Sequence, residues 1–392
     1  MRSVLAVALV IGIAAAGVVP AAADGNFPGA HGEILVLPEP QTAPTRGSGF
    51  GGSVFFSGSS MFPAVLNVAN VVQTTRTEGV FDLPITLLQR DDWDNDAIDV
   101  EAKGTWLEPK IIVTHPVMGE GSRTYKGRGV ILGQIDYVSY QSELDGKGKG
   151  NNPDTKITVN HQAAVVRGGF AYGVLDTWAL GGGVRFLGYH KPEGEIKVNK
   201  NKLTTEGDPG GGLFAVELGT LVKPIDDLHI GVSYEVGAAD NPKIKIKGKA
   251  ANGAKVDTKD KIYRVFPPRF NLGVAYIIRS ANNLQLVGDY WQQQNLEKDD
   301  TDLCLRRQTI ALGAIYPLDK MWTLRGGINK LDESGDGKLN LLGLTAGAGA
   351  DVSKELDVDF NLGYFTGKEE VDDEDAKYQD IRIGGQAAYR FK

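Results

Sequence analysis

Alternation of apolar and polar residues near the end of the chain constrains the fold more than any other feature. Val358, Phe360, Leu362 and Tyr364 are separated by aspartate, asparagine and glycine, and about ten other segments repeat the scheme. A period of two gives a β-strand two different faces. Too few other apolar residues exist to cover the apolar faces with a second layer. Strands that are apolar outside and polar inside are typical of a transmembrane β-barrel.

The first residues carry the pattern of an export signal. Arg2 precedes an apolar run from Val4 to Val19, and three alanines follow at 21–23. A positive start, a short apolar core and small residues at the cleavage site are typical of a secretory signal peptide. We therefore expect residues 1–23 to be removed after Sec-type export. A membrane anchor is the alternative, although the run is short for a spanning helix.

Composition narrows the class of protein further. Cys304 is the only cysteine among 392 residues, which excludes an intrachain disulfide and a Cys-based zinc site. The net charge of -7 argues against a nucleic-acid partner. After residue 23 the sequence contains no run of about 18 apolar residues, so it predicts no membrane-spanning helix. An exported, glycine-rich chain of this kind fits the outer membrane of a Gram-negative bacterium.

Tight and long connections alternate along the second half of the chain. Because short periplasmic turns and long extracellular loops produce this asymmetry, it gives the barrel an orientation. Counting strands backward from the C-terminus, with three less regular ones near 129–140, 106–116 and 80–89, predicts an all-β antiparallel barrel of about fourteen strands. Twelve or sixteen strands are the alternatives. Tight turns are expected at 175–177, 224–227, 280–282, 317–320 and 353–355, and long connections at 189–209, 237–262, 292–306, 330–338 and 367–377.

Residues 24–79 do not follow the alternation that continues through 80–392. They are rich in glycine, proline and serine but contain an apolar patch. Apolar content in a periplasmic segment must be buried, and the barrel lumen is the available place. We therefore predict a plug whose patch contacts ligand, with a periplasmic tail or an extra strand pair as the alternative. The patch comprises Val54, Phe55, Phe56, Met61, Phe62, Val65 and Leu66.

Charged residues recur on the strand faces that are predicted to line the lumen. Neither sign dominates, which favours inward salt bridges that brace the wall, since uncompensated charge is costly away from water. Lining of a selective pore is the alternative. The predicted lumen-facing residues are Arg167, Arg185, Glu217, Glu235, Asp289, Arg325, Asp357, Asp359, Arg382 and Arg390.

The long connection at 237–262 is rich in lysine. Within it, Ile244, Lys245, Ile246 and Lys247 alternate an apolar with a cationic side chain. One interpretation is capture of amphipathic carboxylates, with the ammonium groups taking the head and the isoleucines the tail. The other is a solvated surface hairpin that meets the phosphates of lipopolysaccharide.

No motif predicts an enzyme, a metal site or a cofactor. The five histidines are scattered, and none has a serine or aspartate partner at a motif-like spacing. The run from Asp332 to Gly337 matches the first half of an EF-hand loop, but Gly343 stands where the bidentate glutamate is needed. We therefore interpret this run as a polar hairpin loop.

Two stretches in the second half carry a resemblance. The segment 214–219 leading to 232–234, followed by the lysines of 243–249, and the segment 266–276 beginning Phe-Pro-Pro-Arg are similar to the central hairpin and following strand of the outer-membrane fatty acid and aromatic hydrocarbon transporters of the FadL/TodX type. This resemblance implies fourteen strands, an N-terminal plug and substrate capture by the third and fourth extracellular loops. The family's plug usually carries an Asn-Pro-Ala element, and this chain departs from it, with only Phe62-Pro63-Ala64 and Asn67-Val68-Ala69-Asn70 as partial matches.

The sequence thus predicts a channel for passive uptake of hydrophobic small molecules, without a cofactor. A general porin, or a structural barrel without a specific ligand, is the alternative, and an outer-membrane enzyme is a third class. Outer-membrane lipid and lipopolysaccharide are the expected surroundings. Tyr389 and Phe391 resemble the terminal aromatic signal that is read by the barrel-assembly machinery.

Overall fold

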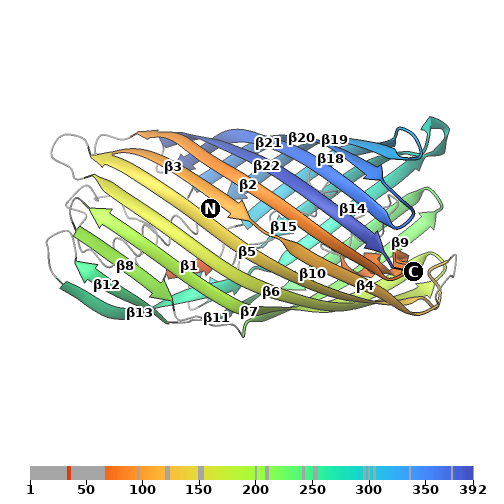
Figure 1. Cartoon of the computed structure of the whole chain (residues 1–392), viewed down its shortest axis with the longest axis horizontal. Helices are drawn as coiled ribbons and strands as arrows, with labels where there is room; N and C mark the ends of the chain where they lie inside the picture. The colour runs from red at the N-terminus through yellow and green to blue at the C-terminus, as the bar shows by residue number, and fades with distance from the viewer. Residues whose placement is uncertain are drawn as a thin grey trace.

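The computed structural model shows a closed antiparallel β-barrel whose strands tilt steeply against its long axis (Figure 1). It describes residues 33–36, 67–94, 98–119, 124–148, 154–198, 201–207, 212–240, 243–249, 255–294, 297–298, 301–302, 306–334, 337–371 and 374–391. No helix in these ranges is long and apolar enough to span a membrane.

Fourteen strands form the wall in the described part of the chain, which confirms the predicted fold. β3 and β4 count as one strand, because both pair with β2 and β5 and only residues 108–109 separate them. The barrel closes where β2 pairs with β22, from Glu78 opposite Arg390 to Asp91 opposite Lys377. The wall strands are β2 (Glu78–Asp94), β3 (Ile98–Leu107) with β4 (Lys110–Met118), β5 (Gly129–Gly148), β6 (Thr155–Leu175), β7 (Trp178–Val198), β9 (Phe214–Ile225), β10 (Leu228–Val236), β14 (Arg269–Ile278), β15 (Leu284–Gln293), β18 (Arg306–Pro317), β19 (Trp322–Ser334), β20 (Gly337–Asp351), β21 (Leu356–Val371) and β22 (Glu374–Arg390).

The two faces of the wall follow the alternation that the sequence predicts. Phe360 and Leu362 on β21 are 56% and 47% exposed, whereas Asp359 and Asn361 between them are buried. Lipid can cover the exposed apolar side chains, and the polar side chains line the inside. The five tight turns join strands at one end, which also holds the last residues of β22 (Figure 1). We call this the turn end.

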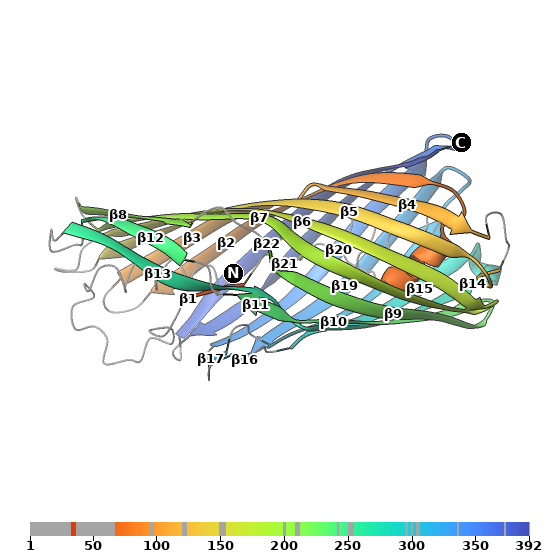
Figure 2. The same cartoon turned by 90° about the horizontal axis from the view of Figure 1, so that it is seen from below.

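At the opposite end the structure differs from the predicted long loops. The segments predicted as connections at 189–209 and 237–262 are largely strand, because their alternating residues extend the ladders beyond the wall. β7 continues to Val198, and a projecting sheet follows it (Figures 1 and 2). The added elements are β8 (Asn201–Gly207), β11 (Ala238–Asp240), β12 (Lys243–Lys249) and β13 (Lys255–Phe266), and β1 (Glu33–Val36) pairs in parallel with β13. β16 (Glu297–Lys298), β17 (Thr301–Asp302) and the 3-10 turn η3 (Arg279–Ala281) lie elsewhere.

Candidate functional site

A short 3-10 helix, η2 (Val68–Gln73), lies inside the barrel near the turn end (Figure 2). It contacts β5, β6, β7, β9 and β10, and Val68, Val71 and Val72 are at most 1% exposed. The wall presents apolar residues toward η2 here, among them Val130 and Leu221. Burial of three valines contributes roughly 1.5–3 kcal/mol each. η2 and the wall therefore form an apolar cluster inside the turn end of the lumen, whereas the lumen beyond it is lined by polar side chains.

Asn67 fixes the start of η2 to the wall. Its Oδ1 accepts a hydrogen bond from the backbone N–H of Ala69 at 3.0 Å, which caps the first turn. Its Nδ2 donates to the carbonyl oxygen of Thr220 on β9 at 2.9 Å. The hydroxyl of Thr220 in turn accepts from Trp178 Nε1 at 2.8 Å. The Asn67-Val68-Ala69 element of the sequence therefore forms the attachment between the N-terminal segment and the barrel.

Three glycines on neighbouring strands form the seat on which η2 lies. A Cβ on Gly181 would lie 2.5 Å from the backbone nitrogen of Ala69. One on Gly169 would lie 2.5 Å from Val68 Cγ2, and one on Gly219 would lie 2.1 Å from Asn67 Oδ1. Such distances are far below ordinary contact, so only glycine lets η2 approach the wall this closely. We call these three residues the glycine seat.

The far end of η2 is also tied to the wall. Arg128 Nη1, beside the start of β5, donates to the carbonyl oxygen of Val72 at 3.0 Å. Thr114 Oγ1 on β4 donates to Thr74 Oγ1 at 3.2 Å. Hydrogen bonds of this kind contribute about 0.5–1.5 kcal/mol each, more where a guanidinium donates. Both ends of η2 therefore have polar attachments.

The charged residues predicted to face the lumen lie on the inner face, and most of them form buried or partly buried ion pairs. Arg167 binds Glu217 through two hydrogen bonds, from Nε at 2.8 Å and from Nη2 at 2.6 Å. Arg185 and Arg269 both donate to Glu235, at 2.9 and 2.6 Å. Because both oxygens of Glu217 are engaged, the first pair holds β6 and β9 in a fixed relation.

A second group of pairs lies on β19, β21 and β22. Arg325 donates to Asp359 at 2.6 Å, and Arg390 pairs with Asp357. Arg382 lies over the ring of Phe365, 3.9 Å from its centroid, and also contacts Asp380. The last of the predicted residues, Asp289 on β15, is 5% exposed.

The proposed capture residues lie on β12 of the projecting sheet. Ile246 is buried at 1% exposure, Lys247 is exposed and Lys245 is half-buried. Successive residues of a strand point to opposite faces, so the isoleucine and the lysines lie on different sides of the sheet. The backbone of Ile244 pairs with Gly207, and its side chain lies outside the described part. The predicted plug residues Val54, Phe55, Phe56, Met61, Phe62, Val65 and Leu66 also lie outside the described residues.

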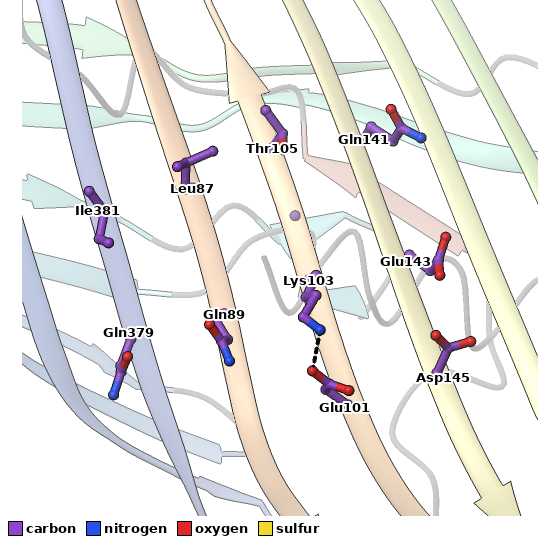
Figure 3. A pocket seen from close by; sticks show the side chains of 11 residues that line it. Leu87, Gln89, Glu101, Lys103, Thr105, Gln141, Glu143, Asp145, Gln379 and Ile381 are labelled. Carbon is purple, nitrogen blue, oxygen red and sulfur yellow. Dashed lines mark ion pairs between the residues drawn. The ribbon is translucent and has the colours of Figure 1, made fainter.

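A pocket of about 590 Å³ lies on the outer face of the wall rather than in the lumen (Figure 3). Its walls come from β2, β3, β5 and β22, on the odd-numbered positions of β2 that also carry the lipid-facing Phe81. Leu87 and Ile381 form its apolar part, and carboxylates and amides form most of the rest, together with Lys103 and Thr105. Its position on the outer surface separates it from the interior seat of η2.

Comparison with solved structures gives clear matches to one group of channels. A Pseudomonas aeruginosa FadL homologue matches with a TM-score of 0.66 and 14% identity, over 92% of this chain and 100% of that one. The Pseudomonas putida toluene transporter TodX matches at 0.63 and 12%, over 89% and 98%. The chain shares the fold of the FadL and TodX channels. The Ralstonia pickettii toluene transporter TbuX matches at 0.61 and 13%, over 90% and 98%.

No protein-family model and no curated protein sequence matches the chain. The FadL/TodX-type fold is therefore visible in three dimensions, while 12–14% identity to these neighbours leaves few shared residues.

Sequence reasoning missed the glycine seat. The three positions lie on strands that are adjacent in space, and their partner is more than 90 residues earlier in the chain. The available signals were the run Gly181-Gly182-Gly183 and the element Asn67-Val68-Ala69. The sequence alone does not show that these two segments contact each other; only the folded structure does.

Proposed function

We propose that this protein is an outer-membrane channel for passive uptake of hydrophobic small molecules such as long-chain fatty acids or hydrocarbons. The observation that supports the proposal is η2, which lies inside the turn end of a FadL/TodX-type barrel and is held there by apolar contacts and by the Asn67 attachment. We infer that η2 closes this end. A barrel closed in this way does not suit steady ion flow, whereas an apolar closure offers hydrophobic molecules a compatible surface.

In the proposed mechanism, substrate is captured by the segments at 189–210 and 237–262 and moves to the apolar residues between Val54 and Leu66. It leaves toward the turn end when the N-terminal segment shifts. Diffusion drives every step, so the mechanism includes no cofactor and no reaction. Deletion of residues 50–70 tests it, because unchanged uptake of fatty acid or alkane would show that the segment takes no part.

The surroundings of the protein belong to the same proposal. Sec-type export would deliver residues 24–392 to the periplasm, and the barrel-assembly machinery would insert the barrel into a membrane that contains lipopolysaccharide. Residues 24–79 would act as the plug and residues 80–392 as the barrel, although the first wall strand already begins at Glu78.

Uptake and conductance together test the proposal. Proteoliposomes that contain the protein should take up a radiolabelled alkane or fatty acid faster than empty liposomes. In planar bilayers the same preparation should be nearly silent. A large and steady ion current without uptake would support the general porin, and neither activity would support a structural barrel.

A further inference from the structure

The projecting sheet has one apolar and one basic face because a β-bulge resets the alternation of β7. Ala164 pairs with Tyr189 while Val165 pairs with Leu187, which leaves Gly188 as the extra residue. A bulge of this kind turns the following side chains to the other face. Beyond it Ile196 is buried at 4% exposure, and its neighbour Lys197 is exposed.

The same division continues across β8 and β12. Leu203 pairs with Ile196, and both are buried, as is Ile246. Lys202 pairs with Lys197, and Lys247 pairs with Thr204 on the opposite side of the sheet from the buried residues. We name the exposed side the basic outer face; its described lysines are Lys191, Lys197, Lys202, Lys245, Lys247 and Lys255.

Positive charge exceeds negative charge on this face. The six lysines share it with four acidic residues, and Glu195 alone serves both Lys197 at 2.7 Å and Lys202 at 2.5 Å. Four more lysines occupy register positions in the same rows. This excess of positive charge contrasts with the net charge of -7 of the whole chain. The acidic residues are Glu193, Glu195, Glu206 and Asp257, and the additional lysines are Lys243, Lys249, Lys259 and Lys261.

The basic outer face continues the lipid-facing surface of the wall. On β7, Leu180, Val184 and Phe186 are between 43% and 49% exposed and apolar. Lys191 follows Phe186 five positions further along the strand, which is about 16 Å at roughly 3.3 Å per residue, and strand tilt reduces the rise. Lys191 therefore lies near the height at which the phosphates of the outer leaflet are expected, and the other lysines of the face extend outward from it, with Lys197 about 20 Å further along the strand.

We propose that the basic outer face binds the phosphorylated headgroups of outer-leaflet glycolipids. This inference rests on the proposed outer-membrane location. Clustered lysines next to an anionic lipid surface attract it, and the attraction falls off within a Debye length. A row of such lipids along this face would hold the projecting sheet upright beside the mouth of the barrel.

The neighbouring part of the wall, which β6 separates from β7, shows that the positive charge is local. The pocket in Figure 3 includes Glu101, Glu143 and Asp145 with only one lysine, Lys103, which pairs with Glu101. Lys103 pairs across the ladder with Glu143, in a row that continues through β6 to Glu195 on β7. Anionic headgroups are therefore expected to gather at β7, β8, β12 and β13 and not at this pocket.

The test measures lipid binding by the full mature protein in detergent. The probes are purified lipid A with its phosphates and the same lipid A after enzymatic dephosphorylation. One variant changes four lysines of the basic outer face to glutamine, and a matched control variant changes four exposed lysines elsewhere. The face variant carries K197Q, K202Q, K245Q and K247Q, and the control carries K103Q, K126Q, K320Q and K354Q.

We expect the wild type and the control to bind phosphorylated lipid A at least about tenfold more tightly than the dephosphorylated form, with a difference that shrinks as salt rises. The face variant should lose this preference while it keeps the heat-resistant gel mobility of a folded barrel. Equal losses in both variants would overturn the proposal. Complete displacement of lipid A by a soluble sulfated polysaccharide would also overturn the proposal, because the face would then bind an anionic polymer rather than a lipid headgroup.

Hydrocarbon uptake separates this proposal from the proposed function. The face variant should still transport, since the glycine seat and the lumen are unchanged. Absence of uptake in the wild type would refute the channel and leave the lipid result standing.

Discussion

Replacement of Gly181 with alanine tests whether η2 closes the barrel. The added Cβ would lie 2.5 Å from the nitrogen of Ala69 and 2.7 Å from its Cα. Ordinary carbon contacts lie at about 3.5–4.0 Å, so η2 must retreat by roughly 1 Å. Both close atoms are backbone, and the wall strand is held by ladders on both sides, so neither partner can yield by a rotamer change.

The size of the effect follows from overpacking. An extra methyl group in a well-packed site costs about 1–3 kcal/mol. Because a tenfold change in an equilibrium corresponds to about 1.4 kcal/mol, the population with η2 displaced should rise roughly 5- to 150-fold. The barrel ladders do not depend on η2, so the folded wall should persist.

Single-channel recording in planar bilayers measures this population as the frequency of open events. Gly182→Ala is the matched control, because a Cβ there meets only Leu218 Cδ2 at 3.5 Å and Glu217 O at 3.7 Å. G181A should open at least about five times more often than G182A. Equal opening frequencies in the two variants would refute the closure by η2.

Three further predictions concern other attachments. Asn67→Ala removes both hydrogen bonds of the cap, about 1–3 kcal/mol in total, and should raise opening frequency in the same recordings without lowering heat resistance. Glu217→Gln leaves the Arg167 guanidinium buried without its carboxylate and should lower the free energy of unfolding by about 3–5 kcal/mol in urea titrations, whereas Lys103→Gln at an exposed pair should change it by less than about 1 kcal/mol. The backbone N–H groups of Met321 and Trp322 donate to the carboxylate of Asp319 and lower the pKa of Asp319. The ionised carboxylate therefore stabilises the folded state at pH values above the pKa of the unfolded state, and this stabilisation is lost as the pH falls through the pKa of the folded state. Asp319→Asn should therefore reduce stability at neutral pH, and the difference from wild type should vanish in acid; a constant difference at all pH values would contradict this.

The wall could be predicted from sequence because lipid and lumen select opposite residue types at alternate positions. Val358 and Phe360 are exposed and Asp357 and Asp359 are buried, as the alternation requires. The tight turns could be placed for a similar reason, since residues such as Pro317 and Asp319 favour them. The pattern therefore predicts the strands and the end at which the tight turns lie.

The projecting sheet was harder to predict because its composition resembles that of solvated loops. Lys243 to Lys247 alternate like a strand, yet lysine at every second position also suits an exposed connection. The ladder between β8 and β12 decides the matter, and it depends on a register between segments about 40 residues apart. The glycine seat shows the same limit, since the reason for each glycine is a partner elsewhere in the chain.

Uptake of a labelled hydrocarbon into proteoliposomes, recorded beside ion conductance of the same preparation, tests the central claim most directly. The account predicts uptake above empty liposomes with near silence in conductance, and for G181A an increase in open events. A steady, large ion current from the wild type, with no uptake of hydrocarbon or fatty acid, would contradict it.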